Sequence, residues 1–476
     1  MIFFVSDEKT SINGKNKMTI TQASKRLFTA ASCLGIVLVQ LDVSIVNVGL
    51  HSLKEAYDAA VSDLEWVINA YALVFAALML SSGSIVDRFG SKKTFISGVL
   101  LFIAASVCCA LAPTIYWLDF TRGIQGIGAA LLLPSSLTLL RQYFSDPRER
   151  ASAIAMWAAA GSLALVAGPV AGGLLIKFFG WKSLFLINFP LGMLSVIVIQ
   201  RLGPASPQSS IKMNLSSQGV IILGLAMLTF TLTEAGNYGW ANPVILTTLV
   251  LGVALMAVFH RVDNRSTNPV IARGVRDNPL IVSAVVVGFL CNLVFYGAVF
   301  IFSIFFQNRL HLSALETGIA FMPMMALTAL VNFCSKWFSA WFSVRTLSIL
   351  GSLISMLGFA IIFFITPGWT ADQLFIPMIL LGSGTSFAMP VMTNVVLSQA
   401  TQSTAGSASA YFNCARQMGG VTGVAVFGLI LSTGGDDMTQ GLRLVAYAAA
   451  AVTLCWVIVS LKKLPFLKLQ ALSSHE

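Results

Sequence analysis

The sequence predicts an all-α polytopic membrane protein. Its 476 residues are 57% hydrophobic and only 10% charged, whereas soluble domains carry about 25% charged residues. The mean hydropathy is +0.84, and the apolar residues form unbroken runs of about 20 residues, the length that crosses a bilayer as a helix. Together these observations exclude a soluble globular protein. The runs also differ from the short alternating strands of an outer-membrane barrel.

Fourteen such runs follow one another along the chain. Backbone groups in lipid satisfy their hydrogen bonds within helices, so we expect each run to be a transmembrane helix. The expected spans are residues 28–50, 64–84, 94–112, 117–140, 151–176, 183–201, 217–236, 243–261, 280–307, 317–338, 344–366, 373–398, 406–432 and 441–461. An even number of spans places both ends of the chain on one side of the membrane.

An internal repeat organises these spans. The pattern G-x-G-x5-P from Gly126 to Pro134 recurs from Gly382 to Pro390, 256 positions later. The same offset relates spans 4 and 12, 2 and 10, and 1 and 9, so two related groups of six helices flank spans 7 and 8, as in transporters with parallel repeats. We expect a tail (1–27), a six-helix bundle (28–201), a linker (202–216), two additional helices (217–261), a linker (262–279), a second six-helix bundle (280–461) and a tail (462–476).

The basic residues predict the topology. With the N-terminus inside, 22 of the 29 lysine and arginine residues fall in inner segments, five fall in outer segments, and Arg122 and Arg416 lie within spans. Lysine and arginine are enriched in cytoplasmic loops. We therefore expect both termini, both tails and both linkers in the cytoplasm. The net charge of +10 then reflects topology rather than nucleic-acid binding.

A charged residue stands inside the fourth span. Arg122 follows Trp117 by five residues, and a guanidinium at the bilayer centre costs about 2.5–3.5 kcal/mol even on lenient scales, so it faces a cavity or a partner. Asp42 is the acidic residue we expect deep in the first span. At about 1.5 Å per residue, Asp42 lies about 12 Å and Arg122 about 8 Å from the outer ends of their spans. We expect the two side chains to meet, either as a structural pair or as a site where proton and substrate compete.

The inner loop between the second and third spans carries a compact charged motif, formed by Gly83, Asp87, Arg88, Gly90, Lys92 and Lys93. Its second glycine permits a tight turn, and its carboxylate can accept hydrogen bonds from helix N-termini or basic side chains. Such a loop can latch two helix bundles and release them when they rock. The alternative is a plain positively charged inner loop. The corresponding stretch of the second half, residues 339–345, has lost the pattern, so we expect an asymmetric latch.

This loop resembles the signature of the major facilitator superfamily, G-x-x-x-D-R-x-G-x-K/R-K/R, at every one of its positions. The stretch from Leu41 to Val48 resembles the L-D-x-T-x-V-N-V-A pattern of the 14-helix drug:proton antiporters of that superfamily, with Ser44 in place of the usual Thr and His51 where Pro is common. The resemblance covers residues 28–461. It implies the major facilitator fold, two six-helix bundles plus two inserted central helices, with alternating access and export coupled to inward proton flow.

The fifth span contains a run of small residues and a proline: Gly161, Gly168, Pro169, Gly172 and Gly173. Small residues on one face let helices pack closely, and an internal proline bends a helix. The pattern G-x6-G-P-x-x-G-G resembles a motif specific to exporters of the superfamily. Generic helix packing is the alternative interpretation.

Two more charged residues complete the candidate set for proton coupling and substrate binding, Asp42, Arg122, Glu234 and Arg416. Glu234 lies at the outer end of the seventh span, where family members often have an acid, and we expect it to be water-exposed. Arg416 lies in the thirteenth span within a sequence that resembles the family's N-x-x-R-Q-x-G-G. We expect it either to bond backbone carbonyls or to bind an anionic group of a substrate.

We therefore expect a bacterial proton-coupled efflux transporter (an antiporter) of the cytoplasmic, or inner, membrane that exports drugs or other amphipathic toxic compounds. The alternatives are a dedicated exporter of one metabolite, such as a siderophore, fatty acid or amino acid, and a non-transporting membrane sensor. An enzyme is disfavoured because the spans lack a nucleophile–base set. The cysteine and histidine spacing indicates no metal site, and we expect no cofactor.

The expected partners are a small-molecule substrate, protons and membrane lipid, without nucleic acid. We expect a monomer, and the sequence leaves open a periplasmic adaptor and an outer-membrane channel. The first 27 residues are polar and lack the apolar core of a cleavable signal peptide. Either Met1 or Met18 can be the start of the protein.

Overall fold

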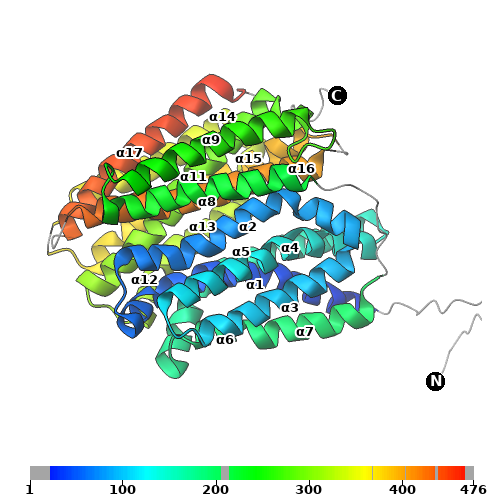
Figure 1. Cartoon of the computed structure of the whole chain (residues 1–476), viewed down its shortest axis with the longest axis horizontal. Helices are drawn as coiled ribbons and strands as arrows, with labels where there is room; N and C mark the ends of the chain where they lie inside the picture. The colour runs from blue at the N-terminus through cyan, green and yellow to red at the C-terminus, as the bar shows by residue number, and fades with distance from the viewer. Residues whose placement is uncertain (1–21, 205–213, 367, 402–403, 435–437, 467–476) are drawn as a thin grey trace, which may run out of the picture.

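The computed structural model of the chain describes residues 22–204, 214–366, 368–401, 404–434 and 438–466. Every regular element in these ranges is a helix (Figure 1). Fourteen helical segments of the described residues are long and apolar enough to cross a membrane, which confirms the predicted number. The chain is a multi-pass membrane protein. Most of both predicted tails, including Met1 and Met18, and most of the 202–216 linker lie outside the described residues.

The first half of the chain, residues 22–202, forms one group of roughly parallel helices (Figure 1). Its helices are α1 (Gln22–Tyr57), α2 (Val61–Phe89), α3 (Ser91–Ala110), α4 (Ile115–Tyr143), α5 (Pro147–Phe179), α6 (Ser183–Leu186) and α7 (Asn188–Leu202). The short α6 and α7 together make the sixth span. Helix α1 continues beyond its predicted end at residue 50, and the Tyr57 hydroxyl near its terminus donates a 2.8 Å hydrogen bond to the Ala112 carbonyl.

The second half, residues 279–463, forms the other group (Figure 1). It contains α11 (Pro279–Ile304), the π-helical turn η1 (Phe305–Arg309), α12 (Ala314–Ala320), α13 (Met322–Trp341), α14 (Val344–Phe363), the 3-10 turn η2 (Ala371–Leu374), α15 (Phe375–Ser398), α16 (Ala405–Ser432) and α17 (Met438–Lys463). Between the halves come α8 (Leu215–Tyr238), α9 (Pro243–Arg265) and the short α10 (Arg273–Arg276). Helix α8 packs against α9, α2 and α16, so it touches both halves.

Local sequence signals set several helix boundaries. The Asp146 side chain accepts a hydrogen bond from the backbone N–H of Glu149 and so caps α5, whose first residue is a proline. Asn278 caps α11 in the same way, again with a proline following. Both patterns satisfy backbone donors that the first helical turn leaves free. Gly90, at a φ of 86°, separates α2 from α3 by one residue.

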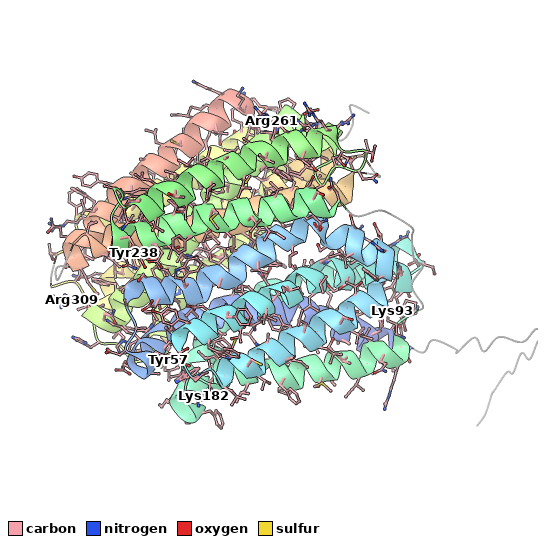
Figure 2. The ribbon with its side chains drawn as sticks, viewed as in Figure 1. Tyr57, Lys93, Lys182, Tyr238, Arg261 and Arg309 are labelled. Atoms are coloured by element: carbon pink, nitrogen blue, oxygen red, sulfur yellow. The ribbon has the colours of Figure 1, made fainter. Side chains whose placement is uncertain are left out.

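The two ends of the molecule are distinguished by labelled residues in Figure 2. Tyr57, Lys182, Tyr238 and Arg309 lie at one end, which we call the outer end, and Lys93 and Arg261 lie at the opposite, inner end. At the outer end the halves are in contact. A side-chain Cβ at Gly173 of α5 would fall 2.8 Å from the Ala314 carbonyl oxygen of α12, so the two helices approach at backbone distance.

The internal repeat is visible in the packing. Gly126 of α4 packs on the backbone of α2 at Tyr71, and its counterpart Gly382 of α15 packs on the backbone of α13 at Met324. The next glycine of each pair, Gly128 or Gly384, packs in the same way on α3 or on α14. Equivalent glycines thus lie at equivalent helix–helix contacts in the two halves.

Two residue pairs that are 256 positions apart also meet directly. The Ser303 hydroxyl of α11 donates a hydrogen bond to the Asn47 carbonyl of α1, and the His51 backbone N–H donates one to the Gln307 side chain (3.2 Å). Equivalent positions contact each other in this way where two equivalent helices cross next to a symmetry axis.

Candidate functional site

The centre of the site is Arg122 on α4, whose side chain is 1% exposed. Its Nη1 donates to Asp42 Oδ2 of α1 (2.5 Å) and to Gln125 Oε1 (2.6 Å), and its Nε donates to the Val67 carbonyl of α2 (2.9 Å). Its guanidinium also lies 4.4 Å from the centre of the Tyr71 ring. The expected meeting of Asp42 and Arg122 therefore occurs, and one side chain joins three helices.

Asp42 is fully buried, and both of its carboxylate oxygens have donors. Besides Arg122, it accepts hydrogen bonds at Oδ1 from Gln125 Nε2 (2.7 Å) and Asn188 Nδ2 (3.3 Å). These two amides also donate to the Ser106 hydroxyl of α3, at 2.8 and 3.2 Å. Removing one partner from a buried ion pair leaves an uncompensated charge and costs about 3–5 kcal/mol, so this network holds its charges tightly.

The sequence places these groups through helix geometry. Arg122 and Gln125 are three residues apart on α4 and therefore share one face. Gly126 and Gly128, directly after them, let α4 approach the backbones of α2 and α3. This close approach brings the Val67 carbonyl and the Ser106 hydroxyl within hydrogen-bonding distance of that face.

A narrow cavity adjoins this network between the two halves. Its volume is about 20 Å³, enough for about one water molecule. Arg122 and Tyr71 line it from the first half, and Tyr296, Gln417 and Gly420 line it from the second half. The Tyr71 hydroxyl is buried and has no hydrogen-bond partner among the described residues, so it is free to bond a molecule in the cavity.

Arg416 lies beside the cavity residue Gln417 on α16 but makes no described contact with the Asp42 network. Its Nη1 donates to Asn413 Oδ1 (3.2 Å), and its guanidinium lies 5.8 Å from the Phe412 ring. Its Nε is buried without a partner among the described residues. The hydrogen bond that Arg416 makes among the described residues is thus to a side chain, whereas one of our two interpretations expected backbone carbonyls.

Glu234 is half-buried on α8 rather than water-exposed as we expected. It accepts hydrogen bonds from the Trp66 ring nitrogen (2.7 Å) and from Asn237 (2.9 Å). Trp66 belongs to α2, so this carboxylate fastens α8 to the first half at the outer end. The structure does not bring it to the Asp42 network.

The 83–93 loop lies at the inner end, where Asp87, Arg88 and Lys93 are exposed. Lys92 instead points back into the first half, and its Nζ donates to the carbonyls of Gln200 and Gly203 at the end of α7 (both 2.9 Å). A Cβ added at Gly83 would meet nothing within 4 Å. In this conformation the two described bonds of Lys92 therefore lie within the first half.

The small residues of α5 face two different neighbours. Gly161, Gly168 and Gly172 face α1, and a Cβ at Gly168 would fall 1.7 Å from Ser44 Oγ. Gly173 faces α12, and the Pro169 carbonyl packs on Gly318 of the same helix. The motif therefore sets the distance of α1, two residues from Asp42, and also the contact between the halves.

Several polar residues of the site were not among the sequence-based candidates. Gln125 and Asn188 follow from the same signal as Arg122, a polar side chain inside an apolar span. Ser106 carries no such signal, because serine is common in membrane helices. Among the described residues, no group of three or more His, Cys, Asp or Glu could hold a metal ion.

Comparisons with known proteins agree with this arrangement. The model of the Major Facilitator Superfamily matches residues 32–424. The chain is 33% identical over 399 residues to the methylenomycin A resistance protein of Bacillus subtilis, covering 84% of this chain and 86% of that protein. It is 29% identical over 398 residues to the methyl viologen resistance protein SmvA of Salmonella typhimurium, covering 83% and 80%.

Solved structures share the fold. A POT family transporter in complex with a thioalcohol conjugated peptide aligns with a TM-score of 0.67 at 14% identity and covers 92% of this chain and 96% of its own. A bacterial homologue of the human lysosomal transporter Spinster, in an inward-facing and unoccupied conformation, aligns with a TM-score of 0.64 at 15% identity, with coverages of 92% and 96%.

Proposed function

We propose, from the premise that this chain belongs to the Major Facilitator Superfamily, that it exports drugs or other amphipathic toxic compounds in exchange for protons. It is a membrane transporter and not an enzyme. The names of its relatives, which include methylenomycin A, methyl viologen and multidrug resistance proteins, support drug efflux. The proposal extends this to the coupling ion and to the residues that carry it.

One observation carries the coupling proposal: Arg122, which lines the cavity between the halves, is paired behind the cavity wall with the buried Asp42. A proton on Asp42 removes the charge that holds Arg122. The guanidinium then keeps Gln125 and the Val67 carbonyl but loses its counter-charge, which favours its turning toward the cavity. Substrate binding in the cavity and proton binding at Asp42 thus compete, as an antiporter requires.

The cavity residues favour an amphipathic substrate. Val43, Val46 and Ile68 supply an apolar wall, while Tyr71 and Gln417 supply polar groups. Ligand pockets combine a mostly apolar lining with a few polar groups that orient the ligand. Since the cavity has room for only about one water molecule here, the proposal requires it to widen when the substrate binds. We infer that the apolar wall binds the hydrophobic part of the substrate and that the free Tyr71 hydroxyl orients its polar part.

The unpartnered Nε of Arg416 favours a second candidate function, export of one endogenous metabolite with an anionic group. A guanidinium binds carboxylates and phosphates through its fork of donors. In that case the substrate would also contact Arg416, the residue next to the cavity residue Gln417 on α16. A narrow substrate range would distinguish this function from drug export.

The 83–93 loop is proposed to act as a latch in the other conformation. With the outer ends in contact, its Asp87 and Arg88 are exposed and are available to bond the second half when the inner ends close. In that conformation, with the inner ends closed, protons from outside the cell would reach Asp42. The loss of this motif in the second half makes the latch one-sided.

We further propose a monomer in the bacterial cytoplasmic membrane, with both termini in the cytoplasm. The excess of basic residues in the inner segments supports this orientation. The bundles are proposed to span residues 28–201 and 280–461, with the inserted pair at 217–261. The contacts of α8 with both α2 and α16 suit a pair of helices that follows the rocking of two bundles.

The function is tested in inverted membrane vesicles that are energised by respiration, with a pH-sensitive dye inside. Lipophilic cations, neutral drugs and organic anions are added in turn to vesicles with the wild type, Asp42→Asn or Asp277→Asn. Asp277 has a side chain that is 69% exposed, so its variant is the matched control. We expect at least one compound to release protons with the wild type and the control but not with Asp42→Asn.

Two results would contradict the proposal. Proton release that persists in Asp42→Asn would place the coupling at another residue. If no compound of the panel releases protons while a single metabolite does, drug export fails and the second candidate function stands.

A further inference from the structure

A second carboxylate is buried in this protein, and it belongs to no predicted site. Glu65 lies one turn from the outer end of α2, and its side chain is only 3% exposed. Its Oε2 has no hydrogen-bond partner among the described residues. Asp42, by contrast, accepts three hydrogen bonds, from Arg122, Gln125 and Asn188, so Glu65 and Asp42 are buried in opposite environments.

The Glu65 carboxylate reaches across the boundary between the halves. Its Oε1 packs on Gly428 of α16, where an added Cβ would fall 2.0 Å from it. The same position on Gly428 is 3.0 Å from the Phe300 ring of α11. The carboxylate is therefore enclosed by apolar groups of the second half as long as the outer ends are in contact.

The charges around Glu65 do not compensate it. Among the described titratable groups on α2, α8, α11 and α16, only Glu234 acts on it electrostatically, and the two carboxylates repel each other. Glu234 is itself fixed by Trp66 and Asn237. The nearby amide of Asn69 donates to Thr233 rather than to Glu65.

A carboxylate that has one oxygen buried without a donor and the other packed against Gly428 is disfavoured in its ionised form. A metal cation in place of a proton would require several oxygen ligands, and the described residues place no group of three or more acidic, histidine or cysteine side chains together. The protonated acid is the form that this closed interface accommodates.

We propose that Glu65 is a second proton-binding site, which takes up a proton from the outside each time the outer ends close. When the ends separate, Glu65 leaves Gly428, meets water and loses its proton. The ionised carboxylate disfavours a return to the contact with Gly428 and Phe300, so the ends stay apart until it is protonated again. This inference rests on the proposed alternating access, but it needs neither a drug nor the Asp42 network.

The test is hydrogen–deuterium exchange of the full chain in lipid nanodiscs, without substrate, over a series of pH values. The opening of the outer ends is followed in peptides that cover residues 61–70 and 425–434, after correction for the intrinsic effect of pH on exchange. One proton bound on closing changes the opening equilibrium about tenfold per pH unit. We expect wild-type opening to increase with pH, and Glu65→Gln, which mimics the protonated acid, to lose about tenfold per pH unit of that dependence.

Glu55→Gln is the matched control, because Glu55 is an outer-end glutamate with a side chain that is 70% exposed, and it should keep the wild-type dependence. Asp42→Asn should keep the part due to Glu65, which separates this proposal from the coupling site. An unchanged pH dependence in Glu65→Gln, or none in the wild type, overturns the proposal. If Glu65→Gln does not fold, Glu234→Gln is the deciding variant. Without the charge of Glu234, ionised Glu65 is more stable in the open state, so opening should shift to lower pH. An unshifted profile overturns the proposal.

Discussion

At the scale of single residues, the arrangement around Arg122 depends on the shape of a guanidinium. One nitrogen donates hydrogen bonds to Asp42 and Gln125, another donates to the Val67 carbonyl, and the flat face lies over Tyr71. An ammonium group is a compact charge without a fixed fork or a flat face. The position therefore requires arginine and not merely a positive charge.

We predict that Arg122→Lys folds but exports poorly. The lysine keeps a charge for Asp42 but loses at least one charge-assisted hydrogen bond, worth about 1.5–3 kcal/mol, which corresponds to about a tenfold or greater loss of transport. Initial rates of export in inverted vesicles measure this. Arg148→Lys, at an exposed inner position, should export like the wild type, and wild-type rates in Arg122→Lys would refute the role of the fork.

The sequence predicted the Asp42–Arg122 pair because both residues are charged, lie inside apolar spans and have similar depth. It did not predict that Gln125 and Asn188 complete the network, since depth says nothing about which way a helix is rotated. Glu65 was missed for a related reason: it lies at the predicted edge of a span, where a glutamate normally reaches water. Its burial depends on α16, which is more than 330 residues away in the sequence.

At the scale of elements, the glycines of α5 determine where α1 lies. Gly161, Gly168 and Gly172 recur at helical spacing and face Ile36, Ser44 and Ile45 of α1. Small residues let two membrane helices approach closely. Ser44, where the related antiporters usually have threonine, is the smaller residue at the tightest of these contacts.

We predict opposite effects for two alanine substitutions. Gly168→Ala places a Cβ where Ser44 Oγ now lies, so it should destabilise the protein by about 1–3 kcal/mol, as overpacking does. Gly219→Ala, in α8, adds a Cβ that meets nothing within 4 Å, and it should be neutral or stabilise by up to about 1 kcal/mol through helix propensity. Thermal unfolding of the two purified variants measures both, and a melting temperature for Gly168→Ala at or above that of Gly219→Ala would contradict the packing.

The elements themselves were predictable because a membrane helix needs a run of apolar residues, and all fourteen appear. The residues at which the helices end were less predictable. Helix α1 extends beyond the predicted boundary because the Tyr57 hydroxyl finds a carbonyl on the neighbouring α3–α4 turn, a tertiary contact that hydropathy does not encode.

At the scale of the whole molecule, two halves with the same glycine packing pattern have different interiors. The glycine pairs of α4 and α15 serve equivalent contacts, but the counterpart of Arg122 is Met378, which is 1% exposed and part of an apolar core. The repeat was visible in the sequence as a 256-residue offset. The first half thus carries the charge network, while the second half supplies the opposite wall of the cavity.

We predict that Gly83→Leu separates folding from turnover. The added side chain meets open space in this conformation. The free energy of unfolding should therefore remain within about 1 kcal/mol of the wild-type value. If the inner ends close against this loop, the same side chain blocks closure, and export should fall by an order of magnitude or more while drug binding persists. Wild-type export by Gly83→Leu would show that the loop does not approach the second half.

The most direct test of the central claim is to count protons released when substrate binds to the purified protein. The compound with the strongest response in the vesicle panel is added to weakly buffered wild type and to Asp42→Asn, with an indicator dye, at a pH where the wild type binds it. If proton and substrate compete at Asp42, the wild type releases up to about one proton per bound substrate, and Asp42→Asn binds without release. Equal release from both proteins would contradict the claim that the Asp42–Arg122 pair couples export to proton flow.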